Sequence, residues 1–117
     1  MAYLRTARRE PENIDSLLKQ LNACHKAAFA RHTAIAEVFI DYGVAGNKPE
    51  RPGIYEMLAK LDADPSIGYV ITADHARIGR SPAVSAIIEH QIADAGCHLV
   101  YATGNHQDQL PQREQAS

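Results

Sequence analysis

The chain has 117 residues, few cysteines, little net charge and no long apolar run. Two cysteines, Cys24 and Cys97, are too few for a disulfide framework, and their apolar neighbours favour buried, reduced thiols. No apolar run is long enough to span a membrane and no signal peptide opens the chain, so we expect a cytoplasmic protein with no membrane partner. The formal net charge of -2 argues against general coating of nucleic acid, but it permits a local basic site.

Motifs for metal and nucleotide chemistry are missing as well. The six histidines include no HExxH pair, and the cysteines form no CxxC pair, so we expect no metal site. The sequence has no dinucleotide fingerprint and no Walker loop, and the glycines at 43 and 46 are too weak a signal for either. The sequence therefore predicts no bound cofactor of these classes.

Along the chain, short apolar runs alternate with segments in which apolar residues recur at helical spacing. Strands are expected at 2–6, 35–40, 69–72 and 98–102. Helices are expected to begin near Pro11, at Pro52 and at Ser81-Pro82, where serine suits the cap and proline the first helical position. The apolar stripe of the first helix comprises Ile14, Leu17, Leu18, Leu21, Cys24 and Ala28.

This order of elements defines a fold class and a domain boundary. A β-α-β-α-β-α-β order predicts a three-layer α/β domain, with a mostly parallel sheet and helices on both faces. The domain is expected to cover residues 1–103. Residues 104–117 are polar and are expected to form a frayed tail.

Four arginines follow the strands at one edge of the expected sheet. Arg5 lies near the end of the first strand, Arg51 follows the second, and Arg77 and Arg80 follow the third. Clustered arginines repel one another, and their planar forks match phosphate oxygens, so the pattern favours an anion site. The alternative is that all four are solvated surface residues. Arg80 also precedes the helix that begins at Ser81, and a helix amino terminus favours negative charge.

Four segments together resemble the catalytic domain of the serine recombinases, the family of resolvases, invertases and serine integrases. Residues 3–7 are Tyr-Leu-Arg-Thr-Ala, where the family has Tyr-x-Arg-x-Ser. Residues 39–46 (Phe-Ile-Asp-Tyr-Gly-Val-Ala-Gly), with Arg-Pro-Gly and Met-Leu inside 51–58, resemble Asp-x-Gly-x-Ser-Gly followed by Arg-Pro and Leu-Leu. Residues 76–81 (Ala-Arg-Ile-Gly-Arg-Ser) resemble Asp-Arg-Leu-x-Arg-Ser, and 95–100 resemble the approach to the next strand. The resemblance implies a resolvase-like, flavodoxin-like domain.

The family's chemistry gives these residues roles by resemblance. A serine attacks a DNA phosphodiester, forms a covalent phosphoserine link and later releases it without metal or ATP. The resemblance implies DNA backbone phosphates and another recombinase subunit as partners, and no cofactor. The implied phosphate-binding residues are Arg5, Arg51, Arg77, Arg80 and Ser81. The implied supporting residues are Tyr3, Gln20, Asp41 and Asp74.

Three positions depart from the family's pattern. Ala7 stands in place of the nucleophilic serine, Ala45 in place of the loop serine, and Ala76 in place of an aspartate. Alanine cannot be a nucleophile, and Thr6 alternates to the face opposite Arg5. Asp74 would share a face with Ala76 on a strand and could substitute for the missing acid.

The leading hypothesis is a recombinase-like domain that has naturally lost catalysis and regulates by binding DNA or an intact recombinase. On this hypothesis the chain as it stands is not a DNA-cleaving enzyme. One alternative is a fragment of an active recombinase with an engineered serine-to-alanine change. Another is an α/β protein that binds a small phosphate or nucleotide.

Overall fold

Four parallel strands form the centre of the molecule. The computed structural model describes residues 1–6, 11–44, 51–79 and 81–103, and its sheet has the strand order β2-β1-β3-β4. All three strand pairings are parallel, as the sequence predicted. The elements in chain order are β1 (Ala2–Thr6), α1 (Pro11–Ala30), β2 (Val38–Tyr42), α2 (Pro52–Ala63), β3 (Tyr69–Thr72), α3 (His75–Ile78), α4 (Pro82–Asp94) and β4 (His98–Tyr101).

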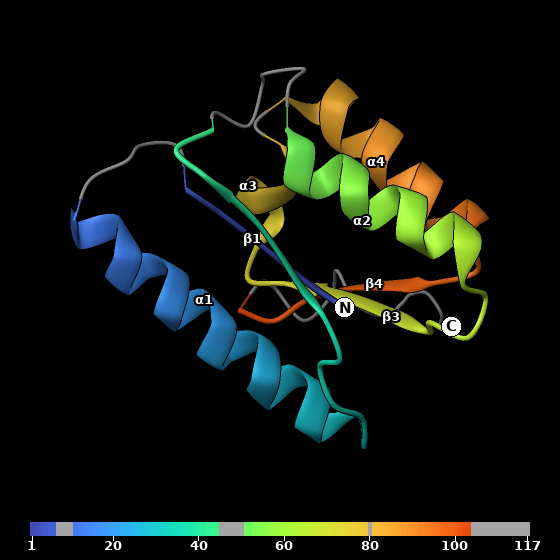
Figure 1. The fold of residues 1–117 in the computed structure, drawn as a ribbon, viewed down its shortest axis with the longest axis horizontal. Helices are drawn as coiled ribbons and strands as arrows, with labels where there is room; N and C mark the ends of the chain where they lie inside the picture. The colour runs from blue at the N-terminus through green and yellow to red at the C-terminus, as the bar shows by residue number, and fades with distance from the viewer. Residues whose placement is uncertain (7–10, 45–50, 80, 104–117) are drawn as a thin grey trace.

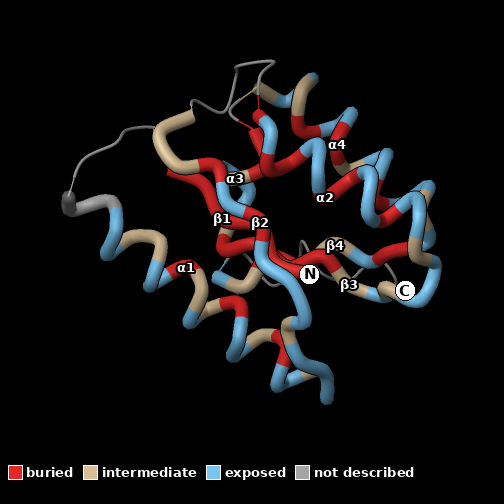
Figure 2. The backbone as a smooth tube through the Cα atoms, viewed as in Figure 1, coloured by how far each residue is buried: buried red, intermediate tan, exposed pale blue. Residues whose placement is uncertain are grey.

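The helices cover both faces of this sheet, which confirms the predicted three-layer arrangement. Figure 1 shows α1 on one face and α2 with α4 on the other. Successive side chains of a strand point to opposite faces. Tyr3 of β1 therefore packs into the cluster that includes α2 and α4, whereas Ala2 and Leu4 pack with Cys24 and Ala28 of α1. Figure 2 shows that β1 is buried along its whole length.

Local signals set the ends of the helices. Pro52 occupies the first turn of α2. A backbone N–H at this position has no acceptor within the helix, so the absence of one in proline costs no hydrogen bond. The Ser81 hydroxyl caps α4 by accepting from the Val84 N–H at 3.1 Å. Gly96 has φ of +83°, the left-handed conformation that glycine adopts readily after a helix. The positions of Pro52 and Ser81 match the sequence predictions.

Two elements differ from the sequence predictions. The second strand was expected at 35–40 but lies at Val38–Tyr42, because Asp41 is buried at its end and interrupts the apolar pattern. The helix α3 was not among the expected elements. Its four residues, capped by Asp74, are too short to show periodicity.

The apolar stripe of α1 is narrower than expected. Ile14 and Leu18 are 52% and 57% exposed. Leu18 lies six residues before the buried Cys24, which places it about 120° round the helix from the packed line. Within the described ranges, no helix is long and apolar enough to cross a membrane.

Candidate functional site

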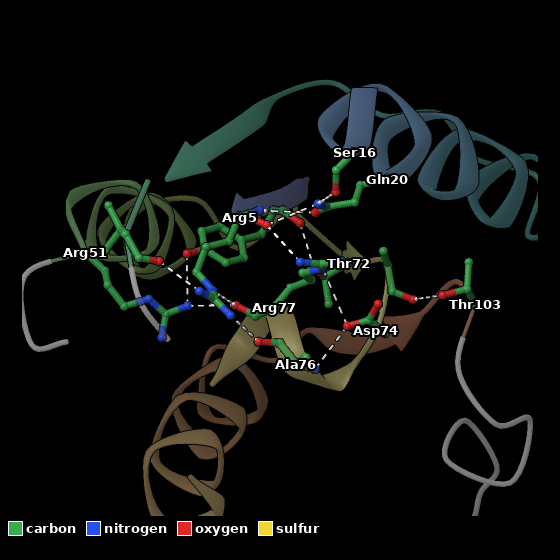
Figure 3. Close-up of polar contacts among 12 residues, drawn as sticks. Arg5, Ser16, Gln20, Arg51, Thr72, Asp74, Ala76, Arg77 and Thr103 are labelled. Carbon is green, nitrogen blue, oxygen red and sulfur yellow. Dashed lines mark hydrogen bonds and ion pairs between the residues drawn. The ribbon is translucent and has the colours of Figure 1, made fainter. Parts of the chain in front are cut away.

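The residues singled out from sequence meet at the carboxyl ends of β1 and β3. Arg5 ends β1, Arg51 precedes α2, and Arg77 belongs to α3; we call these three residues the arginine cluster. Figure 3 shows them with Gln20 of α1 and Asp74. Ala7, Ala45 and Arg80 lie outside the described residues.

Arg5 points inward, onto the segment that carries α3. Its side chain donates to the carbonyl oxygens of Arg77 at 3.1 Å, Ala76 at 2.6 Å and Val44 at 2.8 Å. Only 3% of the residue is exposed. The guanidinium group is therefore compensated by neutral carbonyl oxygens of the protein.

Arg51 makes a second set of contacts with the same segment. Its Nη1 donates to the Ile78 carbonyl at 2.5 Å, and its Nη2 donates to the Arg77 carbonyl at 2.8 Å and the Tyr3 hydroxyl at 2.9 Å. The guanidinium carbon also lies 5.5 Å from the centre of the Tyr3 ring. Arg5 and Arg51 thus bind the carbonyls at the end of α3, which have no partners of their own within so short a helix.

Asp41 joins β2 to the start of α2. Its carboxylate accepts from the Gly53 N–H at 2.7 Å, the Ile54 N–H at 3.0 Å and the Tyr3 hydroxyl at 2.7 Å. Arg51, at the N-cap position, makes no side-chain cap, so Asp41 performs that role from another element. Burial raises the pKa of Tyr3, so its hydroxyl stays protonated and links Arg51 to Asp41.

Gln20 compensates for an early end to strand pairing. The ladder between β1 and β3 stops at Tyr3, so Arg5 has no paired residue on β3, although it is paired with Asp41 of β2. The Gln20 Oε1 accepts from the Arg5 N–H at 3.2 Å, and its Nε2 donates to the Arg5 carbonyl at 3.1 Å and to Ser16 Oγ at 3.1 Å. Arg77 Nη1 donates to the same Arg5 carbonyl at 3.2 Å. Gln20 was expected as a supporting residue from the family resemblance alone.

Asp74 and Ser81 are helix caps in this structure. The Asp74 carboxylate accepts from the Ala76 N–H at 3.1 Å and lies 3.6 Å from Arg77 Nε. The expectation that Asp74 shares a strand face with Ala76 is wrong, because the chain has already left β3 and Asp74 begins α3. Its carboxylate is oriented by the helix start and by Arg77.

The arginine cluster is electropositive but largely closed. It contains three positively charged guanidinium groups, whereas the nearby carboxylates of Asp41 and Asp74 supply two negative charges. Arg77 is its most open member, with 27% of its side chain exposed. Among the described residues, no group of three or more histidine, cysteine, aspartate or glutamate side chains could hold a metal ion.

Sequence reasoning missed one residue that orders the cluster. Thr72, at the end of β3, is fully buried and its hydroxyl donates to the Tyr3 carbonyl at 2.7 Å. A threonine in a strand is ordinary, so no sequence signal marked it.

Comparison with known proteins gives a family and a fold. Residues 1–116 match the family model of the resolvase N-terminal domain. No curated protein matches the chain. Among solved structures, a resolvase-family site-specific recombinase from Streptococcus pneumoniae is similar over 98% of this chain and 78% of its own, with TM-score 0.75 and 18% identity.

Two further structures have the same fold. The N-terminal catalytic domain of the TP901-1 integrase has TM-score 0.75 and 18% identity, over 86% of this chain and 75% of that one. The C-terminal catalytic domain of ISC1926 TnpA, an IS607-like serine recombinase, has TM-score 0.73 and 18% identity, over 97% and 73%. At these identities the similarity shows the fold alone.

Proposed function

This chain belongs to the resolvase family of serine recombinases, and from that premise we propose that it is a recombinase-type domain that binds DNA phosphates without cutting the strand. The observation that carries the proposal is Ala7, two residues beyond Arg5, where the family's motif has the attacking serine. A methyl side chain has no lone pair with which to attack phosphorus. Phosphate recognition and covalent chemistry are thus separable in this chain.

The other hydroxyl groups near the arginine cluster support this proposal. Thr6 is buried, and its Oγ1 accepts from the Gly43 N–H at 3.1 Å. The hydroxyls of Thr72 and Ser85 are buried and donate to backbone carbonyls. Each of these three groups is buried and already makes a hydrogen bond within the fold.

Phosphate binding is proposed to begin at Arg77. This side chain is partly open, and a charge-assisted bond to phosphate is roughly twice as strong as one to a neutral carbonyl. A phosphate that reaches it competes with the carbonyls of 76–78 for the donors of Arg5 and Arg51. Tight binding therefore requires the α3 segment to shift, and weak binding does not.

A regulatory role follows if the domain binds DNA but does not cleave it. A domain that occupies DNA, or that pairs with an intact recombinase subunit, reduces or directs strand exchange by the active protein. Phosphate contacts position a protein without specifying sequence, so the proposed binding is weakly selective for base sequence.

The test is an assay for covalent DNA adducts on supercoiled plasmid. We expect the unaltered protein to give neither relaxed plasmid nor a protein–DNA adduct on denaturing gels. The variant Ala7→Ser restores the missing hydroxyl, and a phosphoserine adduct from this variant alone would identify Ala7 as the main defect. A phosphoserine or phosphothreonine adduct from the unaltered protein would refute the proposal.

A further inference from the structure

A basic groove lies beside α1, apart from the arginine cluster. It has a volume of about 560 Å³ and runs between α1 and the end of β4. No carboxylate is among its described lining residues. The polar side chains that line it are those of Lys19, Asn22, Lys26, Arg31, Tyr101 and Thr103.

Contacts within the described residues do not explain why Lys19 and Lys26 lie at this groove. Arg31 Nη1 donates to the Ala27 carbonyl at 3.2 Å, which suits a cation at a helix carboxyl end. Lys19 and Lys26 lie before the last turn of α1, which holds no basic residue, so the helix dipole does not account for them. Both are exposed, and no ion pair among the described residues includes either. Asp15 lies one turn before Lys19 but does not line the groove.

Residues that line the groove are linked to the arginine cluster through two neighbouring residues. Thr103 donates to the Ala73 carbonyl through its N–H and its hydroxyl, each at 2.7 Å, and the next residue after Ala73 caps α3. On α1, Gln20 follows Lys19 and shares the Arg5 carbonyl with Arg77. Figure 3 shows the Arg77 side chain on the side of the cluster that faces Gln20.

We propose that this basic groove is a second contact for the phosphate backbone of duplex DNA, with Lys19 and Lys26 as its point charges. The inference rests on the proposed function, since it extends a DNA strand beyond Arg77. Lysine is a flexible, strongly hydrated point charge that suits backbone phosphates without demanding one geometry. The two lysines are seven residues apart, a rise of about 10 Å along the helix. At roughly 3.4 Å of duplex axis per phosphate of one strand, the pair spans about three phosphates.

Salt dependence of DNA binding tests the groove. Binding of a short duplex is followed by fluorescence anisotropy between about 50 and 200 mM salt, the range in which phosphate contacts dominate. Affinity falls as salt rises, and each lost phosphate contact makes the slope of log K against log salt less steep by about 0.9, so Lys19→Gln with Lys26→Gln is expected to make it less steep by about 1.8. Lys60→Gln is the matched control, because Lys60 is an exposed lysine on α2, across the sheet from α1.

The outcomes separate this inference from the proposed function. If the unaltered protein binds duplex and the double variant keeps its slope, the groove is refuted and the proposed function stands. If the unaltered protein does not bind duplex, both are refuted. Lysine acetylation read by mass spectrometry adds a direct measure: duplex should protect Lys19 and Lys26 but not Lys60. Protection of the first two in the free protein would mean that the chain itself covers the groove, which also contradicts the inference.

Discussion

The buried arginines and the exposed lysines of this domain carry the same charge in opposite settings. Arg5 and Arg51 are 3% and 1% exposed, and each donates to backbone carbonyls of the α3 region. Lys19 and Lys26 stand in solvent beside a groove and have no ion-pair partner among the described residues. Arg5 and Arg51 are therefore part of the fold, whereas the two lysines are available to a ligand without any rearrangement.

The difference shows why a cluster of arginines does not by itself require an external anion. Burying an isolated charge is costly, but hydrogen bonds reduce that cost. The carbonyls of 76–78, together with Asp41 acting through Tyr3, supply those bonds here. A planar fork of five donors can satisfy more such acceptors than the three donors of a lysine, and it holds them in a fixed geometry. The sequence argument from mutual repulsion therefore identified a real cluster but left out acceptors that the backbone provides.

Removing a buried arginine should have the largest effect on the stability of the domain. Arg51→Ala deletes donors to Ile78, Arg77 and Tyr3 and leaves a cavity in a closed region, so we expect a loss of about 3 kcal/mol or more in the free energy of unfolding. Urea unfolding followed by circular dichroism measures it. Lys60→Ala, on the exposed side of α2, should change stability by less than about 0.5 kcal/mol despite its ion pair with Glu37.

One outcome for Arg51→Ala would contradict this expectation. If Arg51→Ala were as stable as Lys60→Ala, the contacts between Arg51 and the α3 segment would contribute little to the fold. The buried arginines would then be free to exchange their carbonyl partners for a phosphate at small cost.

The fold followed from sequence because apolar periodicity records burial. The runs at 2–6 and 69–72 are buried on both faces, and the observed strands have the same limits. The second strand was misplaced because its last residues include Asp41, a carboxylate that caps α2 across space. A contact between β2 and α2 of this kind leaves no trace in local periodicity.

The candidate site was predictable in position but not in orientation. Strand ends placed Arg5, Arg51 and Arg77 at one edge of the sheet, and the structure brings them together. The direction of each side chain depends on α3, a helix of four residues that pattern analysis did not detect. Sequence reasoning did not single out the groove beside α1, because exposed lysines such as Lys19 and Lys26 are ordinary on a helix.

Gly53, two residues after Arg51, lies in the same buried region. A Cβ on Gly53 would lie 2.8 Å from the Ile40 carbonyl oxygen and 2.9 Å from Asp41 Oδ1. Because one of these atoms is backbone, Gly53→Ala forces β2 and α2 apart, and we expect a loss of about 2 kcal/mol. The same change at Gly68 meets nothing within 4 Å and should be neutral or slightly stabilising.

Thermal unfolding of the two glycine variants provides the measurement. Equal melting temperatures would mean that the approach of Asp41 to α2 is loose. The capping role of Asp41, and with it the contact of Arg51 with Tyr3, would then be less constrained than its distances indicate.

The smallest expected effect comes from the exposed lysines. Lys19→Gln with Lys26→Gln should change the free energy of unfolding by less than about 0.5 kcal/mol, because surface substitutions away from caps and ion pairs rarely exceed that value. Urea unfolding at low and high salt is the measurement, with Lys60→Gln as the reference. A loss of more than about 1 kcal/mol would show that the two lysines are tied to the fold, as Arg5 and Arg51 are. A stable double variant with a reduced salt slope for DNA would instead assign their charge to a ligand, because a charge that does not support the fold is free to act on a partner.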